Sequence, residues 1–242
     1  PHLLVEEGDV NDIALVPGDP GRVERIAAQC ENVETVAENR EYKVVNATYE
    51  GRDLTICSTG IGCPSAAIAV EELARVGVET FIRVGTIGAL QEDIEVGDMI
   101  VATGAAKEEG TSKRYESETY PAVPDYQTLT ALVQSAEAND EDIHVGPIVS
   151  DDAFYNESEE YVADWNEANL LAIEMESRRR HAERSRLRRR TPGKSQEQRR
   201  ARYRHRPRRR ERPVTRDCAG RLLVGVHRRQ HVDFLDFRLT GE

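Results

Sequence analysis

The run at residues 81–90, FIRVGTIGAL, constrains the fold more than any other part of the chain. Apart from one arginine it opens with strand formers and no polar alternation, which is typical of a central strand buried on both faces of a mostly parallel sheet. Arg83 interrupts it, and an unpaired buried guanidinium is costly. Thr86 and Gly88 follow at the carboxyl end, where open α/β sheets bind their ligands. The run predicts either a structural ion pair at Arg83 or an anion site at this strand end.

Strand and helix signals on both sides of this run predict a single α/β domain with a mixed central sheet flanked by helices, and 242 residues are enough for one. The expected strands lie at residues 12–16, 54–58, 81–90, 96–106, 143–149 and 170–175, with one more in the second part of 38–49. The expected helices begin at residue 22 and cover 66–77, 125–139 and 161–166. Glycine and proline inside 143–149 place that strand near a sheet edge.

Charge divides the chain into two unlike parts. Residues 1–177 carry 10 Lys and Arg against 37 Asp and Glu, whereas residues 178–242 carry 23 against 7. The acidic part is also poor in lysine, and such a surface repels itself in dilute buffer but is tolerated where salt screens it. We therefore expect a halophilic source, a halophilic archaeon, over the alternative of an ordinary acidic cytoplasmic protein.

We expect the melting temperature of this protein to rise in molar KCl. About 1 M salt shortens the Debye length to about 3 Å, which removes most repulsion between exposed carboxylates. The measurement is thermal unfolding at increasing KCl concentration, with sucrose as the uncharged control solute. A melting temperature that does not rise with KCl favours the ordinary acidic protein.

Cysteine, histidine and hydropathy patterns exclude several classes of protein. Cys30, Cys57, Cys63 and Cys218 have no CxxC spacing, which indicates free thiols in a reducing cytoplasm. The six histidines form no ligand cluster, so no metal site is expected. There is no apolar run of about 18 residues and no signal-like start, so we expect a cytoplasmic protein without a membrane span.

Two glycine-rich turns each lead from an expected strand into an expected helix. PGDPGR at 17–22 places Arg22 in the first turn of its helix, where backbone N–H groups and the helix dipole favour an anion, although tight glycine turns are common. STGIGCPS at 58–65 resembles a dinucleotide fingerprint. Ser65 replaces its last glycine, however, and no acidic residue closes the next strand, which disfavours a nicotinamide enzyme.

Taken together, the motifs resemble the nucleoside phosphorylase family that includes uridine phosphorylase and the hexameric purine nucleoside phosphorylases. The matching segments are PGDPGR at 17–22, NREY at 39–42, CSTGIGCPSAAIAVEEL at 57–73, FIRVGTIGAL at 81–90, VGDMIV at 96–101, FY at 154–155 and EMES at 174–177. They follow the family's order over about three quarters of the chain. No single segment is specific for the family, but the whole series of segments in the family's order is.

The resemblance implies a site residue by residue. Phosphate would bind Gly18, Arg22, Arg83 and Thr86, with Arg40 supplied by a neighbouring subunit. The ribose would contact Met175 and Glu176, with His2 also from the neighbour, and the base would contact Phe154 and Gly88. The family uses inorganic phosphate as co-substrate and no metal or organic cofactor. Its minimum active unit is a dimer, usually repeated into a hexamer.

The residue types suit phosphorolysis, which replaces the base at the anomeric carbon with phosphate and yields free base and (deoxy)ribose 1-phosphate. Arginine forks and backbone donors can hold and aim the weakly nucleophilic phosphate. The Glu176 carboxylate can accept from both ribose hydroxyls and favour a cationic sugar. Without the resemblance, Glu176 is as consistent with a solvated strand-end acid, and His2 with a frayed terminus.

The identity of the base stays open. Uridine phosphorylases usually hold uracil with a glutamine and an arginine two residues apart, and here Ser158 and Glu160 occupy those positions. The short span from 154 to 174 is more similar to purine and methylthioadenosine phosphorylases. The first 150 residues favour a uridine phosphorylase, and the pocket favours a purine enzyme. We interpret the chain as a uridine phosphorylase-like enzyme, with a purine nucleoside or methylthioadenosine phosphorylase as the alternative. A nucleosidase that uses water instead of phosphate is a further alternative.

The family pattern stops after Ser177. Residues 178–242 are rich in arginine, and 178–213 have no sustained apolar period. We interpret residues 1–177 as a phosphorylase domain that lacks the family's C-terminal leaving-group residue. A frameshift in a GC-rich gene explains residues 178–242 best, and the alternative is a basic tail that binds nucleic acid.

Overall fold

The computed structural model describes residues 2–156 and 158–177, and the backbone of residues 219–226. The strands are β1 (Ile13–Pro17), β2 (Glu31–Asn39), β3 (Tyr42–Tyr49), β4 (Arg52–Cys57), β5 (Thr80–Ala89), β6 (Met99–Lys107), β7 (Ile143–Ser150), β8 (Ala172–Glu174) and β9 (Ala219–Val226). The helices are α1 (Pro20–Ala27), α2 (Cys63–Arg75), α3 (Tyr126–Ala138) and α4 (Glu159–Glu167), with a 3₁₀ turn η1 (Ser112–Arg114).

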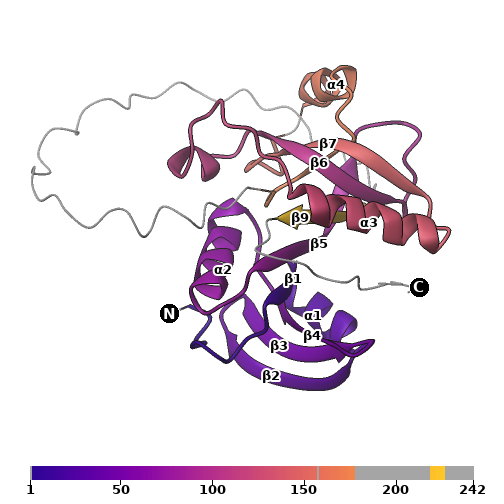
Figure 1. Cartoon of the computed structure of the whole chain (residues 1–242). Helices are drawn as coiled ribbons and strands as arrows, with labels where there is room; N and C mark the ends of the chain where they lie inside the picture. The colour runs from indigo at the N-terminus through magenta and orange to yellow at the C-terminus, as the bar shows by residue number, and fades with distance from the viewer. Residues whose placement is uncertain (1, 157, 178–218, 227–242) are drawn as a thin grey trace, which may run out of the picture.

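The described strands form one mixed sheet in the order β2-β3-β4-β1-β5-β8-β7-β6-β9, and β9 pairs in addition with β5. The strands β5, β8, β7, β6 and β9 therefore close into a ring, while β1 to β4 extend from it as an open sheet (Figure 1). β1 runs parallel to both β4 and β5. The expected α/β domain with a mixed central sheet is confirmed.

The first glycine turn connects β1 to α1. All five residues of β1 are buried. Asp19 caps α1 by accepting a hydrogen bond from the Gly21 amide at 3.1 Å, and Pro20 occupies the first turn, where its missing N–H has no cost. The helix therefore begins two residues before Arg22, the predicted start, and Arg22 lies within its first turn.

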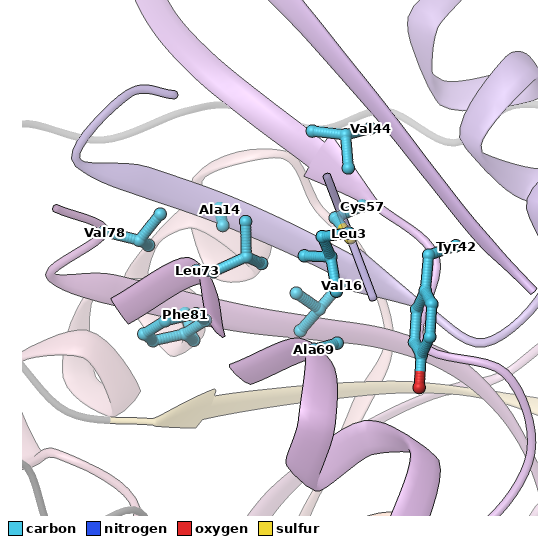
Figure 2. Packing of buried hydrophobic residues seen from close by; sticks show 10 residues of the cluster. All are labelled: Leu3, Ala14, Val16, Tyr42, Val44, Cys57, Ala69, Leu73, Val78 and Phe81. Atoms are coloured by element: carbon cyan, nitrogen blue, oxygen red, sulfur yellow. The ribbon is translucent and has the colours of Figure 1, made fainter. Parts of the chain in front are cut away.

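Helices α1 and α2 cover opposite faces of the sheet. Alternate β1 residues divide between two core clusters: Leu15 lies with the buried residues of α1, whereas Ala14 and Val16 lie with those of α2. Figure 2 shows the second cluster, in which the apolar side chains come from β1, β3, β4, β5 and α2, together with Leu3 and Val78. This core fixes the α2 N-terminus relative to the ends of β1 and β5, which is where the site forms.

Two expectations about strands were wrong. β2 was not predicted, because its first five residues are all exposed and three of its nine residues are glutamates. β7 lies between β6 and β8 rather than at an edge. Its Pro147 pairs with Gly104 next to a register shift in the β6–β7 ladder, and this irregularity accommodates a residue without an N–H.

β9 lies within residues 178–242, beyond the domain boundary predicted at Ser177. It runs antiparallel to β5, from Phe81 paired with Val226 to Gly88 paired with Ala219, and parallel to the first part of β6. In Figure 1 it lies beside β5, on the side that faces β6. The rest of 178–242 is outside the described residues, so the boundary and the frameshift stay predictions.

Candidate active site

Arg83 on β5 meets two carboxylates from the far end of the described chain. Its side chain is 8% exposed, its Nη2 donates to the Glu176 carboxylate, and its Nε lies 3.7 Å from Glu174 Oε2. Its Nη1 donates to the Val16 carbonyl at 3.3 Å and to Thr59 Oγ1 at 3.4 Å. Both terminal nitrogens of the buried guanidinium therefore have partners, whereas Nε has no hydrogen-bond partner among the described residues and only the longer ion-pair contact with Glu174.

Glu176 lies in the turn that follows β8. Besides Arg83, its carboxylate accepts a 2.7 Å hydrogen bond from the Gly62 amide, at the N-terminus of α2. Gly62 has no side chain of its own to cap the helix, and the positive end of a helix dipole favours an anion there. Glu176 is thus an anion held between an arginine and a helix N-terminus.

The two glycine turns meet beside Arg83. A Cβ on Gly18 would lie 3.7 and 3.8 Å from the two terminal guanidinium nitrogens and 3.4 Å from the Gly60 carbonyl oxygen. The Gly60 amide in turn donates to the Gly18 carbonyl at 2.9 Å. The turn at 17–22 therefore approaches the guanidinium with backbone rather than with a side chain, as an anion cradle requires.

Arg22 brings a second cation to the same place. Its Nη1 donates to the Val84 carbonyl at 3.4 Å, which directs the side chain over β5. Burial lowers the pKa of Arg22, and the nearby charge of Arg83 lowers it further. Thr86 follows on β5 and is exposed. Within the protomer, the structure thus brings Gly18, Arg22 and Arg83 together.

His2 and Arg40 do not join this group among the described residues. The His2 ring nitrogen Nδ1 lies 2.7 Å from Glu72 Oε1, and its backbone amide donates to Oε2 of the same carboxylate. Glu72 is ten residues beyond Gly62 along α2, or about 15 Å at 1.5 Å per residue. Arg40 is exposed at the turn between β2 and β3, with φ of 56°. Their supply to a neighbouring subunit stays a prediction.

The residues expected around the base have varied surroundings. Phe154 is 62% exposed and contacts the edge of Tyr155, with ring centroids 5.0 Å apart. Gly88 pairs with Ile173 across the β5–β8 ladder. Met175, which lies between Glu174 and Glu176 in the sequence, is half-buried. Ser158 caps α4 by accepting from the Tyr161 amide at 3.1 Å.

Sequence reasoning missed three groups that contact the site. Glu174, which lies in the segment EMES and ends β8, was given no role from the sequence. Thr59 and the Gly62 amide contact Arg83 and Glu176 from the second glycine turn. The turn from strand to helix was the only sequence signal for the Gly62 amide, and the sequence held no signal for the buried Thr59 hydroxyl.

In the part of the chain that the structure describes, no three His, Cys, Asp or Glu side chains are placed to hold a metal ion. Cys30, Cys57 and Cys63 are free thiols, and Cys218 lies outside the described residues. No helix among the described residues is long and apolar enough to cross a membrane. The charged and polar groups that the structure brings together at this site are Arg22, Arg83, Glu174, Glu176 and nearby backbone amides.

We expect Gly60→Ala to destabilise the protein more than Gly51→Ala. Both glycines have positive φ, 69° and 78°, so both variants carry backbone strain, typically about 1–3 kcal/mol. Only at Gly60 would the new Cβ also meet Ser65 Oγ at 2.7 Å and Glu41 Cγ at 2.8 Å. Chemical unfolding in molar KCl measures the difference, and equal losses would contradict the crowding at Gly60.

Residues 12–178 match the family model described as Phosphorylase superfamily. The chain belongs to this superfamily. A guanosine phosphorylase of Halorubrum lacusprofundi is 80% identical over 177 residues, 73% of each chain. A uridine phosphorylase of Escherichia coli is 39% identical over 192 residues, covering 73% of this chain and 76% of the relative. The solved uridine phosphorylase of Vibrio fischeri has a TM-score of 0.71 and 43% identity, covering 73% and 74%.

These similarities confirm the resemblance to nucleoside phosphorylases and the expected fold of the superfamily. The Halorubrum relative supports the expected halophilic archaeal source. The relatives carry names for both a purine and a pyrimidine nucleoside, so both expected substrate classes have a named counterpart in the superfamily.

Proposed function

We propose that this protein is a pentosyltransferase that cleaves a nucleoside with inorganic phosphate. The observation that carries the proposal is Arg83, held in a phosphorylase superfamily fold between a carboxylate at a helix N-terminus and a glycine turn. Phosphate matches this arrangement because it is an anion with several acceptors, which a guanidinium fork and backbone amides bind together.

In the proposed reaction, phosphate binds Arg83, Arg22 and the Gly18 turn, with Thr86 as a further hydroxyl contact. A phosphate oxygen forms the bond to the anomeric carbon as the glycosidic C–N bond breaks, and the bonding electron pair leaves with the base, which takes a proton. The Glu176 carboxylate accepts from the ribose hydroxyls and favours the cationic sugar. Met175 lies against the ribose. Neither a metal nor an organic cofactor takes part in this proposal.

For the base we propose a purine, with Phe154 and Gly88 at its edges and uracil as the alternative. The Ser158 hydroxyl oxygen accepts the capping hydrogen bond of α4 and leaves one O–H donor, and Glu160 is an exposed acid in the first turn of that helix with no donor when ionised. The pair therefore cannot supply the donors of a glutamine and an arginine to two pyrimidine carbonyls. The 80% identical relative is named a guanosine phosphorylase, which supports the same choice.

We also propose a cytoplasmic homo-oligomer with a dimer as the minimum active unit, repeated into a hexamer. The support is that His2 is bound to Glu72, far along α2 from Glu176, so it does not reach the proposed ribose site of its own protomer. Mixing inactive Arg40→Ala and Arg83→Ala chains tests this. In a mixed dimer, one site combines the intact Arg83 of the first chain with the intact Arg40 of the second, so some activity should return if the site is shared. Light scattering gives the assembly size.

For residues 178–242 we propose a frameshifted segment that follows a phosphorylase domain ending at Ser177, although its strand β9 occupies a place in the sheet. The family match ends at 178, and the composition changes at the same point. Reading the encoding DNA across codons 176–180 in all frames tests this. A tail that binds nucleic acid would instead give a polynucleotide affinity that falls steeply with salt and disappears with residues 178–242.

The deciding experiment uses the full chain in molar KCl with guanosine, inosine, methylthioadenosine and uridine, each with and without phosphate. Phosphate-dependent release of base and a sugar 1-phosphate, fastest with guanosine, is the expected result. Free ribose released without phosphate indicates a nucleosidase. If the chain neither binds phosphate nor releases any base, the proposed function is overturned for this polypeptide.

A further inference from the structure

The Glu174 side chain is buried more deeply than those of its two charged neighbours, Arg83 and Glu176. Its side chain is 1% exposed, against 8% for Arg83 and 9% for Glu176. It ends β8, a short strand held between β5 and β7. A carboxylate in such a place is unstable unless hydrogen bonds or an opposite charge compensate it.

Both oxygens of this carboxylate are bound to the backbone that carries the ribose-binding acid. Oε2 accepts from the Glu176 amide and Oε1 from the Ser177 amide, each at 2.7 Å. These two bonds shape the turn after β8 and fix where the Glu176 backbone lies. Glu174 therefore fixes the position of the Glu176 backbone, from which the Glu176 side chain extends to Arg83 and to the α2 N-terminus.

The same carboxylate also faces the phosphate-binding arginine. Oε2 of Glu174 lies 3.7 Å from Arg83 Nε, while Glu176 pairs with the adjacent Nη2. Burial raises the pKa of Glu174, the charge of Glu176 raises it further, and Arg83 acts in the opposite direction. The three groups are thus coupled, and the two backbone bonds hold the Glu174 carboxylate in place independently of the pair between the Arg83 and Glu176 side chains.

We propose that Glu174 is a positioning residue that sets the geometry between the phosphate-binding Arg83 and the ribose-binding Glu176. This inference rests on the proposed function. It predicts that loss of Glu174 impairs both half-sites at once, weakening phosphate binding and slowing turnover, although Glu174 itself contacts neither substrate.

The test is Glu174→Gln in the full chain. The glutamine has the same shape but a single acceptor oxygen, so its amide group must face either a backbone N–H or the guanidinium. We expect phosphate affinity, measured by calorimetry with inorganic phosphate, to fall about tenfold. The kcat with guanosine should fall about 10- to 100-fold, the range typical of small misplacements in a site.

Glu109→Gln is the matched control. Glu109 is also a fully buried acid, and its Oε2 accepts from two successive amides, those of Thr111 and Ser112. It has no hydrogen bond or ion pair with Arg83 among the described contacts. Both variants should lose thermal stability, but phosphate affinity and kcat should stay within about twofold for Glu109→Gln. If Glu174→Gln does not fold, Glu174→Asp keeps the charge, shortens the reach and provides the same comparison.

The outcomes separate this inference from the proposed function. A wild-type chain that binds phosphate, with unchanged phosphate affinity and kcat in Glu174→Gln, overturns the positioning role alone. Equal losses of kcat in the Glu174 and Glu109 variants indicate a structural role and also overturn it. A wild-type chain that neither binds phosphate nor turns over guanosine overturns the proposed function, and the inference with it.

Discussion

Replacing Arg83 with alanine is expected to abolish phosphate binding and to lower the free energy of unfolding by about 3–5 kcal/mol, the usual cost of removing one partner of a buried ion pair. The side chain is 8% exposed and compensates both Glu174 and Glu176, so its loss leaves two buried carboxylates facing each other. Calorimetry with inorganic phosphate and chemical unfolding in molar KCl measure the two effects.

Arg25→Ala provides the control for removing an arginine. Arg25 is 69% exposed on α1 and pairs with Asp19 at 3.4 Å, an arrangement worth about 0–1 kcal/mol. Arg83→Lys keeps the charge but not the fork, so it should retain more stability than Arg83→Ala while still binding phosphate poorly. An Arg83→Ala chain that binds phosphate like wild type would exclude Arg83 from the anion site.

Replacing Glu176 with glutamine is expected to lower kcat/KM for the nucleoside by about 10²–10³, similar to the loss of one charge-stabilising group in other active sites. Phosphate binding should become tighter in the same variant. The reason is that Glu176 pairs with Arg83 Nη2, so the carboxylate competes with phosphate for that donor, and a neutral amide competes much less. Steady-state kinetics and phosphate calorimetry measure these opposite changes.

Glu34→Gln removes one negative charge from the exposed strand β2 and serves as the control for net charge. It should leave both the kinetics and the phosphate affinity unchanged. If Glu176→Gln lowers phosphate affinity instead, Glu176 and phosphate do not compete for Arg83. An unchanged kcat/KM for the nucleoside would contradict the contact between Glu176 and the ribose.

The parts of the site with local sequence signals could be predicted. The continuous apolar run around Arg83 indicated a buried strand, and the turn at 17–22 indicated a backbone approach to an anion. Both signals depend only on neighbours in the chain, which is why β5 and the Gly18 turn lie where we expected. The choice between an ion pair and an anion site could not be made, because the partner Glu176 is 93 residues away in the chain.

The parts that depend on tertiary packing could not be predicted. Glu174 has the same local sequence signal as any strand-end acid, and only burial between β5 and β7 distinguishes it. β2 has exposed residues along its first half, and only Val36 and Ala37 pack against the core, so its sequence has no clear strand pattern and its pairing with β3 shows it instead. Pro147 suggested an edge, but a register shift in the neighbouring ladder allows an interior strand to contain it.

The position of β9 in the ring has a consequence for synthesis on the ribosome. β9 pairs with residues 81–88 of β5 and 99–101 of β6, which are translated more than a hundred residues earlier. Until then β5 lacks this neighbour along its Arg83-bearing stretch, and a bare strand edge is a template for pairing with other chains. Closure of the ring is therefore a late, long-range folding step, and nascent chains that stall before residue 219 are the species most exposed to aggregation.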